Sequence, residues 1–144
     1  MNLNINYSPE ENQIVGYINV SLKNKTYLQD IKDLPVESCD NVIISDSLNR
    51  VDKEKALEVL NECCSRLAIN GKISIQILDL KYVCVSVISG SLDSKSINDI
   101  IGTTQCILGI SDIKEALNKH RITLVSHSIK HMTTLVDGVK NEVS

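Results

Sequence analysis

A strand, a helix and a second strand follow one another closely in the middle of the chain, and this succession leaves few possible folds. Residues 41–45 form a short apolar run bounded by polar residues, typical of a strand buried on both faces. Asp52 is a suitable N-cap for a helix that continues to about Leu67, and residues 72–78 alternate between polar and apolar side chains. Such a unit joins parallel strands, so we expect an α/β fold with a mostly parallel sheet.

The expected helix has an apolar stripe with the spacing i, i+3, i+4, i+7, formed by Ala56, Leu57, Leu60, Cys63, Cys64 and Leu67. Asn70 and Gly71 follow it, and both residue types tolerate the positive φ that closes a helix. We therefore predict that the helix ends before residues 70–71 and that the next strand begins at Lys72.

The amino-terminal part predicts further strands at residues 3–5 and 16–20, and a brief third strand at residues 26–28. About ten residues separate the first two strands, which is too few for a full helix with its loops. We therefore expect a shortened first crossover.

The carboxyl-terminal part is less regular. Residues 81–88 are compatible with a helix, residues 93–101 indicate a helix capped by Asp93, and Ser111 opens another. Residues 121–125 and 130–136 predict a closing antiparallel hairpin with its turn at residues 126–129. We expect one domain over residues 1–137 and a frayed tail over residues 138–144.

Composition excludes several classes of function. The 144 residues carry a net charge of −3, and the basic residues are scattered, whereas a nucleic-acid partner would require a basic stripe. Four Tyr and no Phe or Trp leave few platforms for base stacking. No apolar run is long enough to span a bilayer. We expect a cytoplasmic protein with no nucleic-acid or membrane partner.

The thiol and imidazole groups do not predict a metal site. The five cysteines include no C-x-x-C pair, and free cysteines are commonly buried as small apolar side chains. His127 and His131 are four residues apart, but we place them around a hairpin, where they would face solvent rather than share a metal.

Six short segments occur in a recognisable order: residues 3–8 (Leu-Asn-Ile-Asn-Tyr-Ser), 16–21 (Gly-Tyr-Ile-Asn-Val-Ser), 33–35 (Asp-Leu-Pro), 45–50 (Ser-Asp-Ser-Leu-Asn-Arg), 70–72 (Asn-Gly-Lys) and 78–80 (Leu-Asp-Leu). In this order they resemble small bacterial and phage proteins of the class I S-adenosylmethionine-dependent methyltransferase family. The likeness covers about residues 1–82 by motif and the remainder by element order. It implies a Rossmann-like class I methyltransferase sheet with a carboxyl-terminal antiparallel hairpin.

The resemblance also implies a cofactor site for S-adenosylmethionine, formed by Asn6, Tyr7, Ser8, Ser21, Asp33, Leu34, Ser45 and Asp46. The chain departs from the family pattern within this set. Asn6 and Ser8 stand where the family has glycines that let the cofactor approach the backbone. Ser21 replaces an acid that would bind the ribose hydroxyls, a loss worth about 1–3 kcal/mol. Asn49-Arg50 replaces a Glu-His pair.

These departures favour a degenerate methyltransferase, a pseudoenzyme that acts as an interaction or assembly module. Its partners would be a second copy of the chain or a larger protein assembly, such as a viral particle. Two alternatives remain open: an active methyltransferase on a small molecule, sugar or protein group, and a binder of nucleotide-sugars or other small ligands. No catalytic residue is identified from the sequence.

Overall fold

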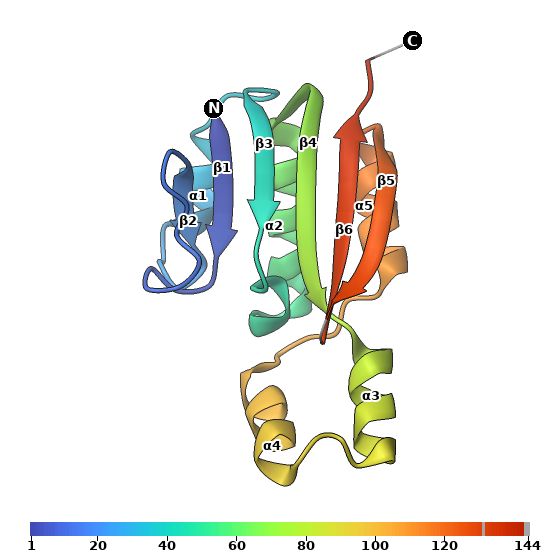
Figure 1. Ribbon diagram of the computed structural model, residues 1–144. Coiled ribbons are helices and arrows are strands. Elements are labelled where there is room, and N and C mark those ends of the chain that lie inside the picture. Colours follow the sequence, from blue (N-terminus) through green and yellow to red (C-terminus); the bar gives the residue numbers. More distant parts are fainter. Residues whose placement is uncertain (131, 143–144) are drawn as a thin grey trace.

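The structure is a computed structural model that describes residues 1–130 and 132–142, without the side chain of Lys130. One six-stranded sheet forms its centre, with the strand order β2-β1-β3-β4-β6-β5 (Figure 1). The first four strands in this order run parallel to one another, and β6 is antiparallel to both of its neighbours, β4 and β5. The sheet therefore confirms the mostly parallel α/β fold with an antiparallel carboxyl-terminal edge. Its strands are β1 (Asn2–Asn6), β2 (Ile18–Ser21), β3 (Cys39–Ile44), β4 (Leu67–Leu78), β5 (Ile122–Lys130) and β6 (Thr133–Lys140).

The shortened first crossover is confirmed, because β1 and β2 lie side by side in parallel and the loop between them contains no helix. The side chains of Asn4 and Asn19 close this loop. The Asn4 amide donates to the carbonyl of Asn12 at 2.6 Å and to Asn19 Oδ1 at 2.8 Å. These bonds hold the middle of the loop against β1 and β2.

The predicted third strand at residues 26–28 is wrong, because α1 (Tyr27–Lys32) occupies this segment. Thr26 and Asp30 are linked by a side-chain hydrogen bond of 3.1 Å at the start of the helix. Tyr27 and Ile31, one turn apart, pack on the apolar core, and Ile31 is fully buried. Burial of this helical stripe outweighs the strand preference of three residues.

The central helix is α2 (Lys53–Arg66), and Asp52 is its N-cap, as predicted, accepting a hydrogen bond of 2.9 Å from the amide of Lys55. The chain passes directly from α2 into β4 at Leu67, which is earlier than the predicted start at Lys72. Asn70 has a positive φ of 65°, so it turns the chain within β4 rather than closing the helix. Leu67 pairs with Cys39 before this irregularity, and Lys72 pairs with Asn41 after it.

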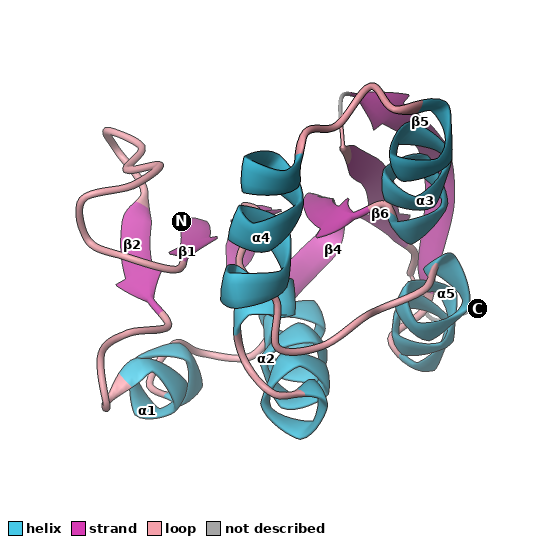
Figure 2. Cartoon of the chain, turned by 90° about the horizontal axis from the view of Figure 1, so that it is seen from below, coloured by secondary structure: helices cyan, strands magenta, loops and turns pink. Residues whose placement is uncertain are grey.

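Three helices, α1, α2 and α5 (Ile110–Lys119), cover one face of the sheet (Figure 2). The core between them contains aliphatic and cysteine side chains, with Leu3, Ile5, Ile44 and Ile75 among the fully buried residues. No helix of the described residues covers the opposite face. This face carries Ile43 and mostly polar side chains: Asn2, Asn4, Asn41, Lys72, Ser74 and Gln76. The β1–β2 loop covers part of it, because Asn4 is 0% exposed and binds Asn12 and Asn19.

Two further helices, α3 (Leu80–Ser89) and α4 (Ser94–Thr103), project beyond the carboxyl ends of the parallel strands (Figure 1). The helix predicted from Asp93 is confirmed, and Asp93 caps α4 by accepting from the amide of Ser96 at 2.8 Å. Residues 81–88, for which the sequence allowed a helix without deciding it, lie in α3. The short helix η1 (Leu48–Arg50) follows β3 at the same edge.

The closing hairpin is confirmed, but its predicted turn at residues 126–129 is wrong. Strand β5 continues to Lys130 and β6 begins at Thr133, because Ser126 to Ile129 pair with Asp137 to Thr134 along the ladder. His127 therefore lies within β5, and His131 lies outside the described residues. Strand β6 reaches Lys140, so the expected boundary between residues 137 and 138 falls inside this strand.

Candidate functional site at the carboxyl edge of the sheet

The carboxyl edge is where open α/β sheets bind ligands, and there the structure brings together six of the eight predicted site residues. Asn6 and Ser21 pair across β1 and β2, Ile5 pairs with Ile44, and Ser45 and Asp46 directly follow β3. The backbone amide of Ser45 also donates to the carbonyl of Ile5 at 3.0 Å. Tyr7 and Ser8 continue from β1 into the loop that precedes β2.

Ser21 binds this loop rather than facing an open site. Its hydroxyl donates a hydrogen bond of 2.8 Å to the carbonyl of Tyr7. The backbone reinforces the contact, because Leu22 N–H donates to the Asn6 carbonyl at 2.9 Å and Lys23 N–H donates to the Tyr7 carbonyl at 3.0 Å. The chain after β2 is thus fastened to the end of β1.

The ring of Tyr7 contacts two cations. The Arg50 guanidinium is 4.9 Å from the ring centroid, and the Lys23 ammonium is 5.6 Å from it. Arg50 also forms an ion pair of 2.9 Å with Glu11. Cation–π contacts and the ion pair therefore connect the β1–β2 loop to η1.

The positions expected to be glycine are filled and closed to solvent. Asn6 is 0% exposed and Ser8 is 5% exposed. The Ser8 hydroxyl binds the carboxylate of Glu10, and this hydrogen bond lowers the pKa of Glu10. Neither polar atom of the Asn6 amide has a hydrogen-bond partner among the described residues. A ligand would reach this amide only if the covering loop moved.

Asp46 has a different environment, because it lines a cavity of about 380 Å³ between the strand ends and α4. Burial raises the pKa of Asp46, Arg50 opposes this effect and Glu11 adds to it. Among the described residues, none donates a hydrogen bond to the Asp46 carboxylate. This cavity can therefore hold a polar ligand that donates hydrogen bonds to Asp46.

Several cavity residues were not found from the sequence. They are Gln76, Leu78, Ile100, Thr103, Thr104, Met132 and Thr133. One signal was present: the alternation of residues 72–78 places Gln76 on the polar side of β4. No local signal marks the α4 residues, because only the position of α4 beyond the sheet brings them to this edge.

Asn49 connects three elements at the floor of this region. It is almost fully buried, its Oδ1 accepts from the amide of Leu78 at 2.8 Å, and its Nδ2 donates to the carbonyl of Cys106 at 3.1 Å. Its own carbonyl accepts from the backbone amides of Gln105 and Cys106. The residue aligned with a family glutamate thus holds β4 and the α4–α5 connection to η1.

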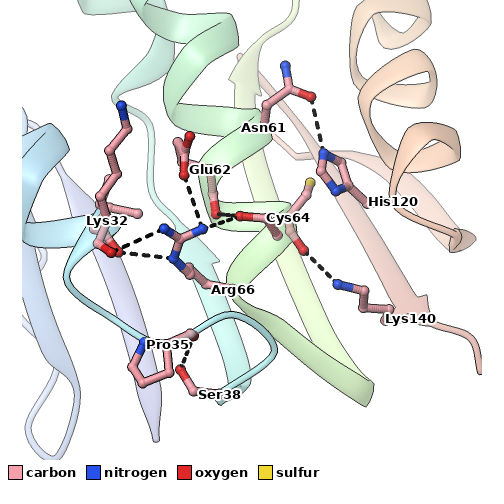
Figure 3. Close-up of polar contacts among 11 residues, drawn as sticks. Lys32, Pro35, Ser38, Asn61, Glu62, Cys64, Arg66, His120 and Lys140 are labelled. Atoms are coloured by element: carbon pink, nitrogen blue, oxygen red, sulfur yellow. Dashed lines mark hydrogen bonds and ion pairs between the residues drawn. The ribbon is translucent and has the colours of Figure 1, made fainter.

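The structure does not bring Asp33 and Leu34 to the other site residues. They follow α1 between Lys32 and Pro35, two residues that Figure 3 shows near Arg66, the last residue of α2. This is the amino-terminal edge of the parallel strands. The Arg66 guanidinium donates to the carbonyls of Ile31 at 3.3 Å and Lys32 at 3.2 Å. Asp33 itself accepts from the Gln29 amide at 2.6 Å. Both residues thus lie at the opposite end of the parallel strands from Asn6 and Ser21.

A second buried polar cluster lies at this amino-terminal edge (Figure 3). Lys140 is 2% exposed, and its ammonium donates to the carbonyl of Cys64 at 3.1 Å and lies 3.7 Å from Glu37. Burial lowers the pKa of Lys140, and Glu37 opposes this effect. The cluster joins β6 to the end of α2.

Within the described residues, no three His, Cys, Asp or Glu side chains are arranged to hold a metal ion. In the same part of the chain, no helix is long and apolar enough to cross a membrane.

Comparison with known proteins gives a result for the fold and none for the sequence. No protein-family model and no curated protein matches the chain. Solved structures do match it. A complex between the Haloferax volcanii Trm112 methyltransferase activator and a methyltransferase has a TM-score of 0.61 at 10% identity, covering 99% of this chain and 83% of that one.

Two other structures give the same result. A SAM-dependent methyltransferase from Archaeoglobus fulgidus has a TM-score of 0.59 at 14% identity, covering 87% of this chain and 68% of that one. An O-methyltransferase family protein from Burkholderia thailandensis has a TM-score of 0.61 at 16% identity, covering 89% of this chain. The fold is that of a class I S-adenosylmethionine-dependent methyltransferase.

The chain spans only part of the length of several of these structures. The chain covers 37% of the Burkholderia protein and 51% of the magnesium protoporphyrin IX methyltransferase from Synechocystis, a structure with bound SAH. In this chain α1, α2 and α5 lie on one face of the sheet, and the first crossover is a loop.

Proposed function

We propose that this protein is a methyltransferase-fold pseudoenzyme that does not bind S-adenosylmethionine and instead acts as an interaction module. The observation that supports this most directly is the bond between Ser21 Oγ and the Tyr7 carbonyl, 2.8 Å long. The hydroxyl at the ribose-binding position is used as a donor within the protein. A carboxylate at this position would accept hydrogen bonds from both ribose hydroxyls, and Ser21 offers none.

The adenosyl group also lacks space in its usual place. Close approach to the backbone after β1 requires glycine, whereas Asn6 and Ser8 have side chains buried to 0% and 5% exposure. The Tyr7 ring contacts both Arg50 and Lys23, so moving it aside would break two cation–π contacts. The residues present therefore do not fit the cofactor, and we derive no methyl-transfer step.

Calorimetric titration with S-adenosylmethionine and S-adenosylhomocysteine tests this proposal. We expect no heat of binding and no rise in Tm. Ligand at 100 times its Kd would stabilise the protein by about 2.7 kcal/mol, which a thermal-shift measurement would detect. Binding of either compound at micromolar concentration would overturn the proposal.

A gain-of-function variant makes the test sharper. Replacing Asn6→Gly and Ser8→Gly opens the loop, and Ser21→Asp supplies the carboxylate. If loss of these groups explains the lack of binding, the triple variant gains affinity for S-adenosylhomocysteine. The matched control carries Asn6→Gly and Ser8→Gly with Ser21→Ala, which opens the same space without the acceptor.

A second function, binding of a small ligand, is favoured by the Asp46 cavity of about 380 Å³. The Arg50 charge is already paired with Glu11, so the carboxylate of Asp46 leaves the cavity with an excess negative charge. This charge favours cationic amines and disfavours the diphosphate of a nucleotide-sugar, and polyols could donate hydrogen bonds to the carboxylate. A thermal-shift series with sugars, polyamines and nucleotide-sugars tests the preference, and Asp46→Asn should abolish any shift that depends on this site.

A further inference from the structure

Strand β5 forms the last position of the sheet, and its outer edge pairs with no strand among the described residues. The strand is nine residues long. An edge of this length presents backbone N–H and C=O groups that a further strand can bind. Proteins usually protect such an edge with charged side chains or proline.

The edge lacks this protection over most of its length. Residues 122–129 (Ile-Thr-Leu-Val-Ser-His-Ser-Ile) contain no Asp, Glu, Lys, Arg or Pro. Apolar side chains on it are exposed to solvent, with Val125 at 63% and Ile129 at 58% exposure. A strand that approaches this edge therefore meets no fixed charge and covers apolar surface.

The segment is also self-complementary. Residues 125–129 have the same order of side-chain types in both directions: aliphatic, serine, histidine, serine, aliphatic. An antiparallel pair with a two-fold axis at His127 sets each Ser126 opposite Ser128 of the other copy. A register irregularity lies between Leu124 and Ser126, so the regular ladder would start at Ser126. Because residues 125–129 contain no Asp, Glu, Lys or Arg, this pairing of two copies sets no two like charges of these residue types opposite each other.

Additional apolar surface adjoins the edge on the helix-covered side. Ile129 and His127 line a hollow of about 350 Å³ together with Leu80 and Ile107, which are 46% and 43% exposed. A second strand along β5 would cover part of this hollow. Burial of these side chains would add to the hydrogen bonds of the ladder.

We propose that two copies of this chain associate through their β5 edges to form one continuous twelve-stranded sheet about a two-fold axis. This inference rests on the proposed role as an interaction module and names its partner as a second copy. The contact is small, so the dimer forms and dissociates with protein concentration.

Sedimentation equilibrium of the full chain tests the inference. We expect a mass that rises with concentration from 15.9 kDa toward twice that value. Ile129→Lys and, as a second variant, Val125→Lys place a charge on the edge and should leave a monomer. The matched control is Ile101→Lys, which replaces an isoleucine of 68% exposure on α4 and should leave the association unchanged. Circular dichroism checks that each variant is folded.

Hydrogen exchange locates the contact. We expect amides of residues 126–129 to become more protected as concentration rises, while those of α4 do not change. A wild-type chain that stays monomeric, or a dimer without added protection in β5, overturns the inference. Cofactor titration separates this result from the proposed function: a monomer that ignores S-adenosylmethionine refutes only the edge pairing, and a β5 dimer that binds it refutes only the loss of cofactor binding.

Discussion

The Asn49 side chain accepts a hydrogen bond of 2.8 Å from the backbone amide of Leu78, although the two residues are 29 positions apart. Asn49 uses its remaining amide group to bind the carbonyl of Cys106. One side chain therefore joins η1, the end of β4 and the segment that leads from α4 to α5. The position of α4, and with it the Asp46 cavity, depends on this contact.

Asn49→Ala is expected to lower the free energy of unfolding by about 2–4 kcal/mol, because two buried backbone groups lose their partners. Asn49→Asp keeps the acceptor for Leu78 but buries a carboxylate against the Cys106 carbonyl, so at pH 7 its loss should be at least as large. Urea denaturation of the three proteins measures the order. Equal stability of Asn49→Ala and the wild type would refute a structural role for this residue.

Asn4 and Asn6 form a matched pair in β1. Asn4 is hydrogen-bonded to Asn12 and Asn19, whereas the Asn6 amide has no partner among the described residues. Asn6→Leu removes an unsatisfied buried amide at similar volume and should leave stability unchanged or raise it by about 1 kcal/mol. Asn4→Leu should lower it by about 1–3 kcal/mol. Denaturation curves compare the two, and a larger loss for Asn6→Leu would indicate that its amide binds a group essential to the fold.

Asp46 should make stability depend on pH. Burial raises its folded-state pKa above the ordinary value, so the folded protein holds this proton more tightly than the unfolded chain does. Its contribution to stability therefore increases as pH falls through the folded pKa, and its ionised form is unfavourable at neutral pH. Asp46→Asn should be more stable than the wild type at pH 7, by no more than about 1 kcal/mol.

That difference should shrink toward pH 4, as the wild-type carboxyl gains its proton. Thermal unfolding between pH 4 and pH 7 measures it. Asp99→Asn, an exposed change on α4, provides the comparison. A wild type that is the more stable protein at pH 7 would contradict the assigned burial effect.

The five thiols should react at two very different rates. Cys84 is exposed, and the other four are buried. Burial raises the pKa of Cys64 to about 12 and that of Cys63 well above its usual value, so neither supplies thiolate near neutral pH. At pH 8 an aromatic disulfide reagent should modify one thiol rapidly and the remaining four only after urea is added. Cys84→Ser should abolish the rapid phase, and several rapid thiols in the native wild type would show that the α2 cysteines are accessible.

The sequence predicted the parallel strands, α2 and its Asp52 cap because these features are local. Periodicity of 2 or 3.6 residues and a capping side chain depend on neighbours within a few positions. The turn at residues 126–129 was predicted wrongly for the complementary reason. Polar residues there resemble a turn, but pairing of Ser126 and Ser128 with β6 keeps them in a strand.

The candidate site shows the same division. The sequence identified Asn6, Ser8 and Ser21 as departures from the methyltransferase pattern, since their identity alone conflicts with a glycine loop and a ribose-binding acid. It did not separate them from Asp33 and Leu34, which lie at the opposite edge, because that separation depends on the direction in which α1 crosses the sheet.

The amino-acid sequence by itself determined the class of fold and the chemical groups present at the strand ends. Tertiary structure alone decided what those groups do: Ser21 binds Tyr7, Asn49 holds β4, Asp46 faces a cavity, and β5 is left at an open edge. The physical reason is that hydrogen bonds and burial between residues far apart in the chain are fixed by strand order and helix placement, which no local pattern encodes.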